Sequence, residues 1–183
     1  MRGVVPGMGE DDFVMIWNGV ILDWYDIDLL LRAVHRLKDK HAKLRLFFMG
    51  TEHPDSYGAK KLEGLGGGVT KRAIALCEEL GILNKHVIFN FTWATNDDTQ
   101  QYLLESDMAV CTYFDSLETR YSFRVRYTDV FWAGLPLVCT AGDIVADWVH
   151  ERELGVRVPE GDLDALTAAI DRLASDDAFR ARC

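Results

Sequence analysis

The sequence predicts an α/β fold: a single Rossmann-like, doubly wound parallel sheet with helices on both faces. Apolar runs typical of strands alternate with amphipathic runs typical of helices along the whole chain. The strand runs are rich in β-branched and aromatic residues and show no polar alternation, which is typical of strands buried on both faces. Because no internal repeat or low-complexity linker interrupts the alternation, we expect one domain over residues 1–183.

The first half of the chain supplies strands and helices in turn. FVMIWNG (13–19) is short, apolar and bounded by acids, and it predicts a buried strand. Residues 27–41 predict a helix, because apolar side chains recur there at helical spacing, at Ile27, Leu30, Leu31, Val34 and Leu37. The next elements are a strand at 43–50, a helix at 70–80 with Thr70 as its N-cap and Gly81 after its end, and a strand at 86–91.

The second half continues the pattern. A short helix is predicted at 97–106 and a strand at 107–113. The helix predicted at 123–133 ends before Gly134, which suits a helix terminus. The remaining elements are a strand at 135–140, a helix at 143–152, a strand at 154–158 and a helix at 162–174.

The segment 51–69 is long for a connection between a strand and a helix. It contains GLGGG, which could cradle a phosphate. These glycines do not directly follow a strand, however, and they break the GxGxxG spacing of a dinucleotide site. We therefore expect a surface loop, and a lid rather than a phosphate-binding loop if it has a function.

Composition excludes several classes of protein. A net charge of −9 argues against a nucleic-acid partner and against adhesion to an anionic membrane. No apolar run reaches the roughly 18–20 residues that span a bilayer, and MRGVVPGMGEDD does not resemble a secretion signal. Three of the four cysteines (Cys77, Cys111, Cys139) fall in apolar elements, so we expect buried thiols in a cytoplasmic protein. No histidine has metal-ligand spacing to a partner, so no metal site is predicted.

Polar residues and glycines gather in four loops that follow predicted strands. These loops are NGVILDWYD, TWATND, FDSLETRYS and TAGD. Ligands of doubly wound sheets bind at the carboxyl ends of the strands, near the point where the strand order reverses. The four loops are therefore the expected site. Trp17, Trp132 and Trp148 lie inside predicted elements, and we interpret them as core residues.

Three arginines gather at the start of the predicted helix 123–133. Ser122 is a suitable N-cap, and Arg120, Arg124 and Arg126 would surround its positive end. Such crowding favours an exogenous anion, with the guanidinium forks on phosphate oxygens. The alternative is internal compensation by Glu118 or Asp129, and Arg126 and Asp129 have the three-residue spacing of a helical pair.

The segment YSFRVRYTDVFWAGLPLV (121–138) resembles the donor-site helix of retaining glycosyltransferases with the GT-B fold. That family has the pattern Glu-x-Phe-Gly-x4-Glu-Ala-x-Ala-x-Gly-x-Pro-Val-Val. Asp129 matches the second glutamate and Phe123 the phenylalanine, whereas Tyr121 replaces the first glutamate and Arg124 the glycine. Glu118 lies three residues upstream of Tyr121. The closest similarity is to a bacterial subgroup with Glu-Thr-Arg-Tyr-Ser-Phe-Arg-x-Arg, Trp-Ala-Gly-Leu-Pro and a following Gly-Asp.

The resemblance extends over nearly the whole chain and implies one half of a GT-B fold. In that half, Asp129 would bind the donor ribose, and Glu118 or Tyr121 would face the donor sugar. Thr92 and Trp93 lie where the family contacts the base. The first loop, with Asn18 and Gly19, lacks the family's arginine and lysine, so we expect Arg120, Arg124 and Arg126 to hold the diphosphate instead. The full list of expected donor-binding residues is Asn18, Gly19, Thr92, Trp93, Glu118, Arg120, Tyr121, Ser122, Phe123, Arg124, Arg126 and Asp129.

The resemblance also implies an activity. The chain would be the donor-binding half of an enzyme that transfers a sugar from a nucleotide diphosphate sugar to a hydroxyl acceptor, with surface polysaccharide synthesis as the expected process. It would need no cofactor, and by itself it would be an inactive fragment without the acceptor domain. That domain would hold the catalytic base, and any peripheral membrane association would occur only through the full-length enzyme. The alternatives are a GT-B-like sugar-nucleotide epimerase and a non-catalytic nucleotide-binding module.

Overall fold

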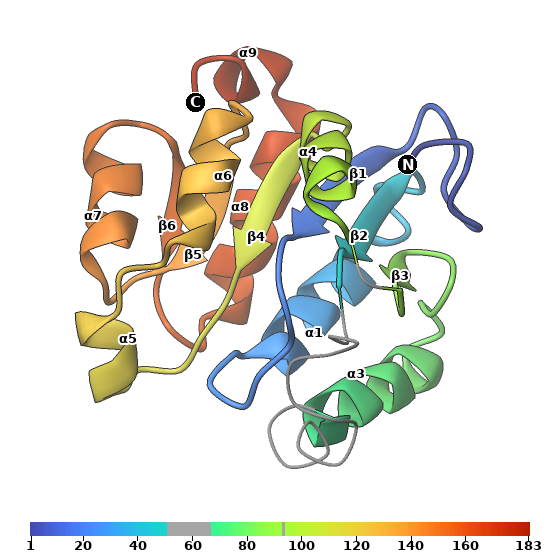
Figure 1. The fold of residues 1–183 in the computed structure, drawn as a ribbon, viewed down its shortest axis with the longest axis horizontal. Helices are drawn as coiled ribbons and strands as arrows, with labels where there is room; N and C mark the ends of the chain where they lie inside the picture. Colours follow the sequence, from blue (N-terminus) through green and yellow to red (C-terminus); the bar gives the residue numbers. More distant parts are fainter. Residues whose placement is uncertain (51–66, 93) are drawn as a thin grey trace.

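The computed structural model describes residues 1–50, 67–92 and 94–183. Within these ranges, six strands form one parallel sheet in the order β3-β2-β1-β4-β5-β6 (Figure 1). The strands are Phe13–Trp17 (β1), Leu44–Phe48 (β2), Val87–Phe89 (β3), Met108–Cys111 (β4), Leu137–Thr140 (β5) and Gly155–Val158 (β6). Each lies inside a range predicted as strand, which confirms the doubly wound parallel sheet.

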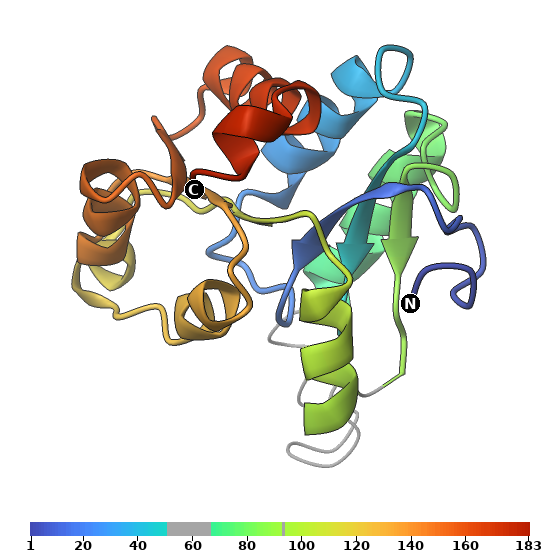
Figure 2. The ribbon, with the colours of Figure 1, turned by 90° about the horizontal axis from the view of Figure 1, so that it is seen from above.

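Helices cover both faces of this sheet. Figure 2 shows α1 and α8 together on one face and α4 and α6 on the other. The described helices are Ile27–Leu37 (α1), Gly67–Glu79 (α3), Asn96–Leu104 (α4), Leu117–Tyr121 (α5), Arg126–Trp132 (α6), Ile144–Glu151 (α7), Leu163–Ser175 (α8) and Asp177–Arg180 (α9). None of them is both long and apolar enough to cross a bilayer.

Two predicted helix starts were wrong. The predicted helix 123–133 is the shorter α6, and α5 precedes it. The hydroxyl of Ser116 accepts a hydrogen bond from the Thr119 N–H and caps α5, whereas Ser122 lies at the other end of α5 with an extended backbone. Ser122 therefore does not cap a following helix. Thr70 does not cap α3 either, because that helix already begins at Gly67 and Thr70 is buried within it.

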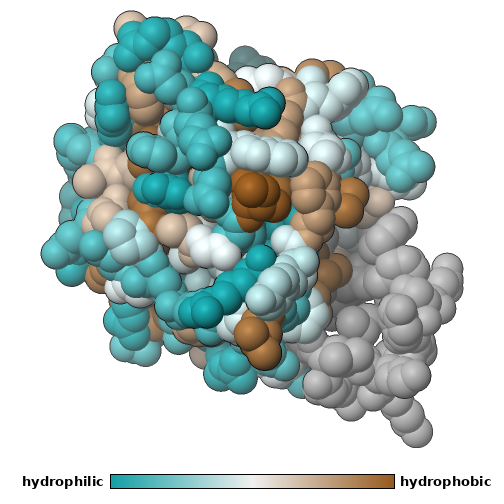
Figure 3. All heavy atoms as spheres, turned by 90° about the vertical axis from the view of Figure 1, so that its left-hand side faces the viewer, coloured by the Kyte–Doolittle hydropathy of each residue, from teal (hydrophilic) through white to brown (hydrophobic). Residues whose placement is uncertain are grey.

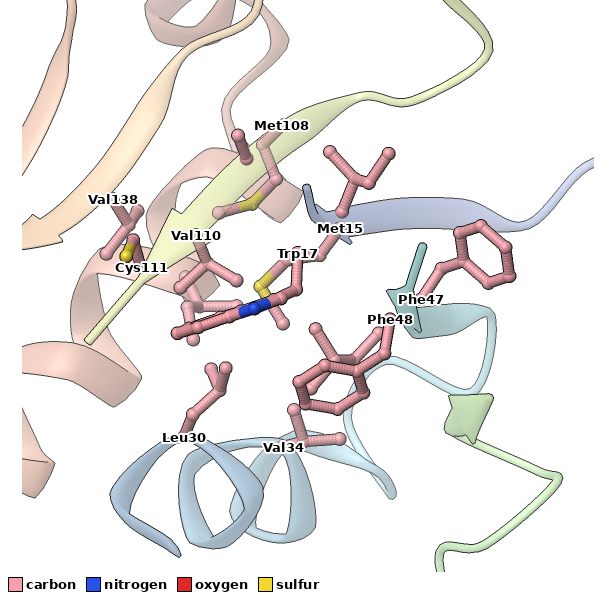
Figure 4. Close-up of a cluster of buried hydrophobic side chains, with 14 of the residues drawn as sticks. Met15, Trp17, Leu30, Val34, Phe47, Phe48, Met108, Val110, Cys111 and Val138 are labelled. Atoms are coloured by element: carbon pink, nitrogen blue, oxygen red, sulfur yellow. The ribbon is translucent and has the colours of Figure 1, made fainter. Parts of the chain in front are cut away.

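Trp17 lies at the centre of the core, between the sheet and α1. Figure 4 shows its indole beside Leu30 and Val34 of α1 and Phe48 of β2. Trp17 is fully buried, as predicted, and Trp148 is half-buried. The prediction that Trp132 is a core residue was wrong, because its side chain is 61% exposed. The helix α6 is only two turns long and buries Tyr127 and Val130, which leaves Trp132 on its outer side.

Small and apolar side chains let the strands pack closely. A Cβ atom at Gly155 would lie 2.0 Å from the carbonyl oxygen of Leu137, so only glycine allows β6 to pair with β5 here.

Cys77, Cys111 and Cys139 are buried free thiols, as predicted. Burial raises the pKa of Cys77 to about 12. These thiols are therefore core residues and are protonated at neutral pH.

Candidate functional site

The strand order reverses between β1 and β4, and the loops that follow these two strands are joined there. Tyr25 and Tyr113 form an antiparallel bridge. The Asp26 N–H donates to the carbonyl of Thr112 (3.0 Å), and the Thr112 hydroxyl donates to the carbonyl of Asp26 (2.7 Å). The loop after β1 is therefore fixed to the loop after β4 at the edge of the sheet where ligands of this fold bind.

Arg126 reaches from the start of α6 across to the loop after β1. Its carbonyl oxygen accepts a hydrogen bond of 3.0 Å from Nδ2 of the buried Asn18. Its guanidinium lies against Gly19, where an added Cβ atom would be only 2.7 Å from Nη1 and 2.8 Å from Cζ. Asn18 and Gly19, both predicted as site residues, are thus brought together with Arg126.

The guanidinium of Arg126 has no carboxylate partner among the described residues. Its Nη2 donates a hydrogen bond of 2.5 Å to the hydroxyl of Tyr25. Its Cζ lies 4.9 Å from the ring centre of Tyr25 and 5.9 Å from that of Trp17. Nη1 is buried and has no hydrogen-bond acceptor in the described part of the chain. The alternative pair with Asp129 is not formed, and Asp129 is exposed.

Arg120 and Arg124 are, in contrast, compensated by acids of the same chain. Arg120 donates two hydrogen bonds to Asp115, of 2.9 and 2.6 Å, on the surface. Arg124 is only 6% exposed and donates two bonds of 2.9 Å to the carboxylate of Glu118. The internal alternative is therefore realised for Arg124. That all three arginines hold a diphosphate stays a prediction, and among the three only Arg126 lacks a carboxylate partner in the described part of the chain.

Arg124 belongs to a buried polar network that ties α5 to the loop after β5. Its Nε lies 3.7 Å from Oδ2 of the buried Asp143. The hydroxyl of Tyr113 lies 2.8 Å from the same Oδ2, and Oδ1 of Asp143 caps α7 by accepting from Ala146 N–H at 2.7 Å. Burial raises the pKa of Tyr113, so this hydroxyl stays protonated. The network thus holds α5 against the start of α7, and its member Tyr113 is bridged to Tyr25, the partner of Arg126.

Glu118 is held as a carboxylate on the exposed side of this network. Burial alone would raise the pKa of Glu118, but hydrogen bonds from Ser122 and Arg124 outweigh it and keep the pKa below its usual range. The Ser122 hydroxyl donates to Oε1 of Glu118 at 2.7 Å. Ser122 thus lies at the C-terminal end of α5 with its hydroxyl on Glu118.

Aromatic side chains form the outer part of the site. Tyr121 is 85% exposed, and Phe123 is 51% exposed and packs edge to face on Trp148. Figure 3 looks at the side of the molecule that carries α5 and α7, where apolar side chains interrupt a mainly hydrophilic surface. These residues offer an open surface rather than an enclosed pocket.

Three stacked phenylalanine rings, here called the phenylalanine ladder, run from Phe48 in β2 through Phe89 in β3 to Phe91 in the loop after β3. The rings of Phe48 and Phe89 are stacked with centres 4.7 Å apart, and the half-exposed Phe91 is stacked 6.2 Å beyond Phe89. Beside it, the exposed Thr92 donates hydrogen bonds from its N–H and its hydroxyl to Oδ1 of Asn90, at 3.1 and 2.6 Å. Trp93, also predicted in the site, and most of the segment 51–69 lie outside the described residues.

Several residues of the site were missed by sequence reasoning. Tyr25 and Asp115 lie in loops that the sequence placed at the site, but neither was predicted as a partner of an arginine. Tyr113 ends a predicted strand, and its partner Asp143 is 30 residues away in the chain. Asp143 did carry a signal, since an acid directly before a helix is a typical N-cap. Among the described residues no three histidine, cysteine or acidic side chains are grouped as metal ligands. In the described part of the chain, the arrangement offers a guanidinium without a carboxylate partner, exposed aromatic rings and polar loops. This combination suits an anionic ligand with an aromatic group.

Nearly the whole chain is similar to known glycosyltransferases. The family model described as "Glycosyl transferases group 1" matches residues 5–183. No curated protein matches the sequence significantly. Solved structures with the same fold include WaaG, a glycosyltransferase involved in lipopolysaccharide biosynthesis, at 19% identity and a TM-score of 0.70, covering 96% of this chain and 41% of that one.

Two further structures have a similar fold. The C-terminal domain of the glycosyl transferase group 1 protein LpcC from Francisella tularensis has a TM-score of 0.74 at 16% identity, with 97% of this chain and 81% of that one covered. HepE from Anabaena, in complex with UDP and glucose, has a TM-score of 0.74 at 16% identity, with 94% and 41% covered. The chain thus spans about two fifths of WaaG and HepE.

Proposed function

Because this chain belongs to the glycosyl transferases group 1 family, we propose that it is the donor-binding half of a glycosyltransferase. Its ligand is a nucleotide diphosphate sugar, and the complete enzyme transfers the sugar to a hydroxyl acceptor. A separate acceptor domain, which faces this half of the enzyme, supplies the catalytic base and holds the acceptor.

The four cysteines of the present chain form no disulfide, which is in keeping with a reducing, cytoplasmic location.

The observation that carries the proposal is the uncompensated guanidinium of Arg126 beside Gly19, at the switch in strand order. A diphosphate is the group that such a cation binds best, because guanidinium N–H groups match phosphate oxygens in geometry and charge. A charge-assisted hydrogen bond of this kind contributes about 1.5–3 kcal/mol. The buried Nη1 would also gain the acceptor that the described residues do not provide.

The rest of the donor is assigned to the neighbouring loops. Asp129 lies in the first turn of α6, three residues from Arg126, and its exposed carboxylate can accept hydrogen bonds from ribose hydroxyls. Phe91, whose ring is stacked on that of Phe89, can stack on the base, and Thr92 and Trp93, the next two residues in the sequence, are assigned to the same contact. Glu118, Tyr121 and Phe123 are assigned to the side of the sugar.

Catalysis in this proposal consists of positioning and charge stabilisation. The bond between the sugar carbon and the diphosphate oxygen breaks, and the acceptor oxygen bonds to that carbon and loses its proton. Arg126 stabilises the negative charge that builds up on the departing diphosphate. The acceptor oxygen must come within about 3–3.5 Å of the sugar carbon, which one open surface cannot enforce. The isolated chain should therefore bind the donor without turning it over.

A ligand panel tests the proposal directly. Purified protein is titrated by calorimetry with nucleoside diphosphates of each base, with the matched nucleosides and with inorganic pyrophosphate. We expect one nucleoside diphosphate to bind with a Kd in the high micromolar to millimolar range, roughly −4 to −6 kcal/mol, and its nucleoside to bind far more weakly. Absence of binding by every diphosphate at millimolar concentration would contradict the proposal. Robust sugar transfer by the isolated chain would contradict the proposal that a separate acceptor domain is needed for catalysis.

A further inference from the structure

We infer that Tyr25 is a positioning residue that fixes the guanidinium of Arg126 over Gly19 without neutralising its charge. The inference rests on the proposed function, because the charge preserved in this way is the one that would meet the donor diphosphate. The Tyr25 hydroxyl acts as a neutral clamp, a name used here for its hydrogen bond to Nη2 of Arg126 together with the ring beneath the guanidinium.

The geometry of the clamp restricts Arg126 from two directions. The hydroxyl oxygen of Tyr25 is 2.5 Å from Nη2, and the ring centre is 4.9 Å from Cζ. Gly19 lies on another side of the guanidinium, where even a methyl group would not fit. An arginine side chain normally keeps much rotamer freedom, and losing it on binding reduces affinity. Arg126 has already lost much of that freedom before any ligand arrives.

Tyr25 can act as a clamp because its own position is fixed. Its side chain is only 4% exposed, and its ring packs edge to face on Trp17 with centres 4.9 Å apart. Its backbone N–H donates to the carbonyl of Leu22 at 3.1 Å, and the bridge to Tyr113 joins it to the loop after β4. The clamp therefore transmits the rigidity of the sheet to the guanidinium.

The chemical identity of the partner matters as much as its position. The same chain holds Arg120 with Asp115 and Arg124 with Glu118, and each carboxylate cancels the arginine's charge. Tyrosine can accept the same hydrogen bond while carrying no charge. Burial raises the pKa of Tyr25, although the charge of Arg126 opposes this effect, so the hydroxyl remains a neutral phenol at physiological pH. An incoming anion then meets a guanidinium whose charge is not cancelled by its hydrogen-bond partner.

Two measurements on the intact chain test the inference. The first is NMR of the Arg126 guanidinium, in which rotation about the Nε–Cζ bond is compared between wild type and Tyr25→Phe without ligand. We expect slow rotation in wild type and faster rotation in the variant. Equally fast rotation in both proteins would overturn the clamp, whatever the protein binds.

The second measurement is a double-mutant cycle on binding. Tyr25→Phe should weaken binding of the best nucleoside diphosphate and of pyrophosphate by roughly three- to tenfold, the range of one net hydrogen bond. In an Arg126→Met background the same substitution should have no further effect, because Tyr25 acts only through the guanidinium. Tyr102→Phe in α4, whose half-buried ring packs on Phe47, is the matched control and should bind like wild type.

The outcomes separate the two proposals. If wild type binds a diphosphate and Tyr25→Phe binds it equally well, or if the loss persists in the Arg126→Met background, the positioning role is overturned while donor binding stands. If wild type binds neither diphosphate nor pyrophosphate, the proposed function fails, and the role of the clamp in binding fails with it. Slow guanidinium rotation in wild type alone would then support only the geometric part of the inference.

Discussion

The guanidinium of Arg126 lies so close to Gly19 that a single methyl group there would overlap it, at 2.7 Å from Nη1. Gly19 lies in the loop after β1, whereas Arg126 begins α6, which follows β4 and α5 on the other side of the switch in strand order. Gly19→Ala should therefore displace the guanidinium and weaken diphosphate binding by about 1–3 kcal/mol while leaving nucleoside binding unchanged. Calorimetry checks this, with Gly68→Ala as control, because a methyl group there meets nothing closer than 3.9 Å. Equal affinity of Gly19→Ala and wild type would count against the contact.

Arg126→Met removes the uncompensated charge and keeps most of the apolar stem. We expect a loss of about 1.5–3 kcal/mol in binding of the nucleoside diphosphate and no loss for the nucleoside. Arg120→Met is the comparison, since Arg120 is already paired with Asp115 on the surface. Titration of both variants with the nucleoside diphosphate shows which arginine contributes more to its binding. A larger loss of affinity in Arg120→Met than in Arg126→Met would contradict the assignment of Arg126.

Arg124→Met should act on stability before it acts on binding. The substitution leaves the fully buried carboxylate of Asp143 without its nearby cation and breaks two hydrogen bonds to Glu118. Removing one partner of a buried pair typically costs about 3–5 kcal/mol, and the half-exposed Glu118 places this case near the lower end. Urea denaturation provides the measurement, and Arg120→Met should lose much less stability, because its pair with Asp115 lies exposed on the surface. Comparable losses for the two variants would refute the network's role.

Asp129→Asn tests the ribose assignment. No ion pair with Arg126 or any other described residue involves Asp129, so the variant should unfold at the same temperature as wild type. Binding of the nucleoside diphosphate should weaken, whereas pyrophosphate, which has no ribose, should bind as before. Paired titrations and melting curves measure both quantities. A parallel loss for both ligands would place Asp129 at the phosphates instead.

Stability should depend on pH through Glu118. The pKa of Glu118 in the folded protein lies below its ordinary value of 4.5, so the contribution of Glu118 to stability is present above that pH. It is lost as the pH falls below about 4.5 and through the folded pKa, because the protonated group gives up its bonds from Ser122 and Arg124. The difference in unfolding free energy between wild type and Glu118→Gln should therefore shrink below pH 4.5. A difference that stays constant down to pH 3 would show that Glu118 is not held as a carboxylate.

The sequence by itself determined the fold. Each strand from Phe13–Trp17 to Gly155–Val158 lies inside a range predicted from its apolar character, because strands buried on both faces must be continuously apolar. Gly81 and Gly134 were correctly expected after α3 and α6, and both have a positive φ. The same reasoning predicts a site at the loops after the strands, since parallel strands end together at one edge.

Local sequence could not decide how the helix near Ser122 begins. Serine is a good N-cap residue, so Ser116 and Ser122 are both suitable by residue type. In the structure, the hydroxyl of Ser116 accepts a hydrogen bond from a backbone N–H at the start of α5, whereas Ser122 lies at the end of α5. The prediction that Trp132 is buried was likewise wrong. A two-turn helix buries only one of its sides, and in α6 the buried side carries Tyr127 and Val130.

The charge state of the site was decided only by the tertiary structure. The sequence showed Arg120, Arg124 and Arg126 close together with nearby acids, and spacing alone allowed Asp129 to pair with Arg126. In the folded chain Glu118 lies against Arg124, Asp115 against Arg120, and the phenol of Tyr25 against Arg126. Tyr25 is 101 residues away from Arg126 in the chain. Coulomb and hydrogen-bond energies depend on distances of a few ångströms, and only folding sets those distances between residues so far apart in sequence.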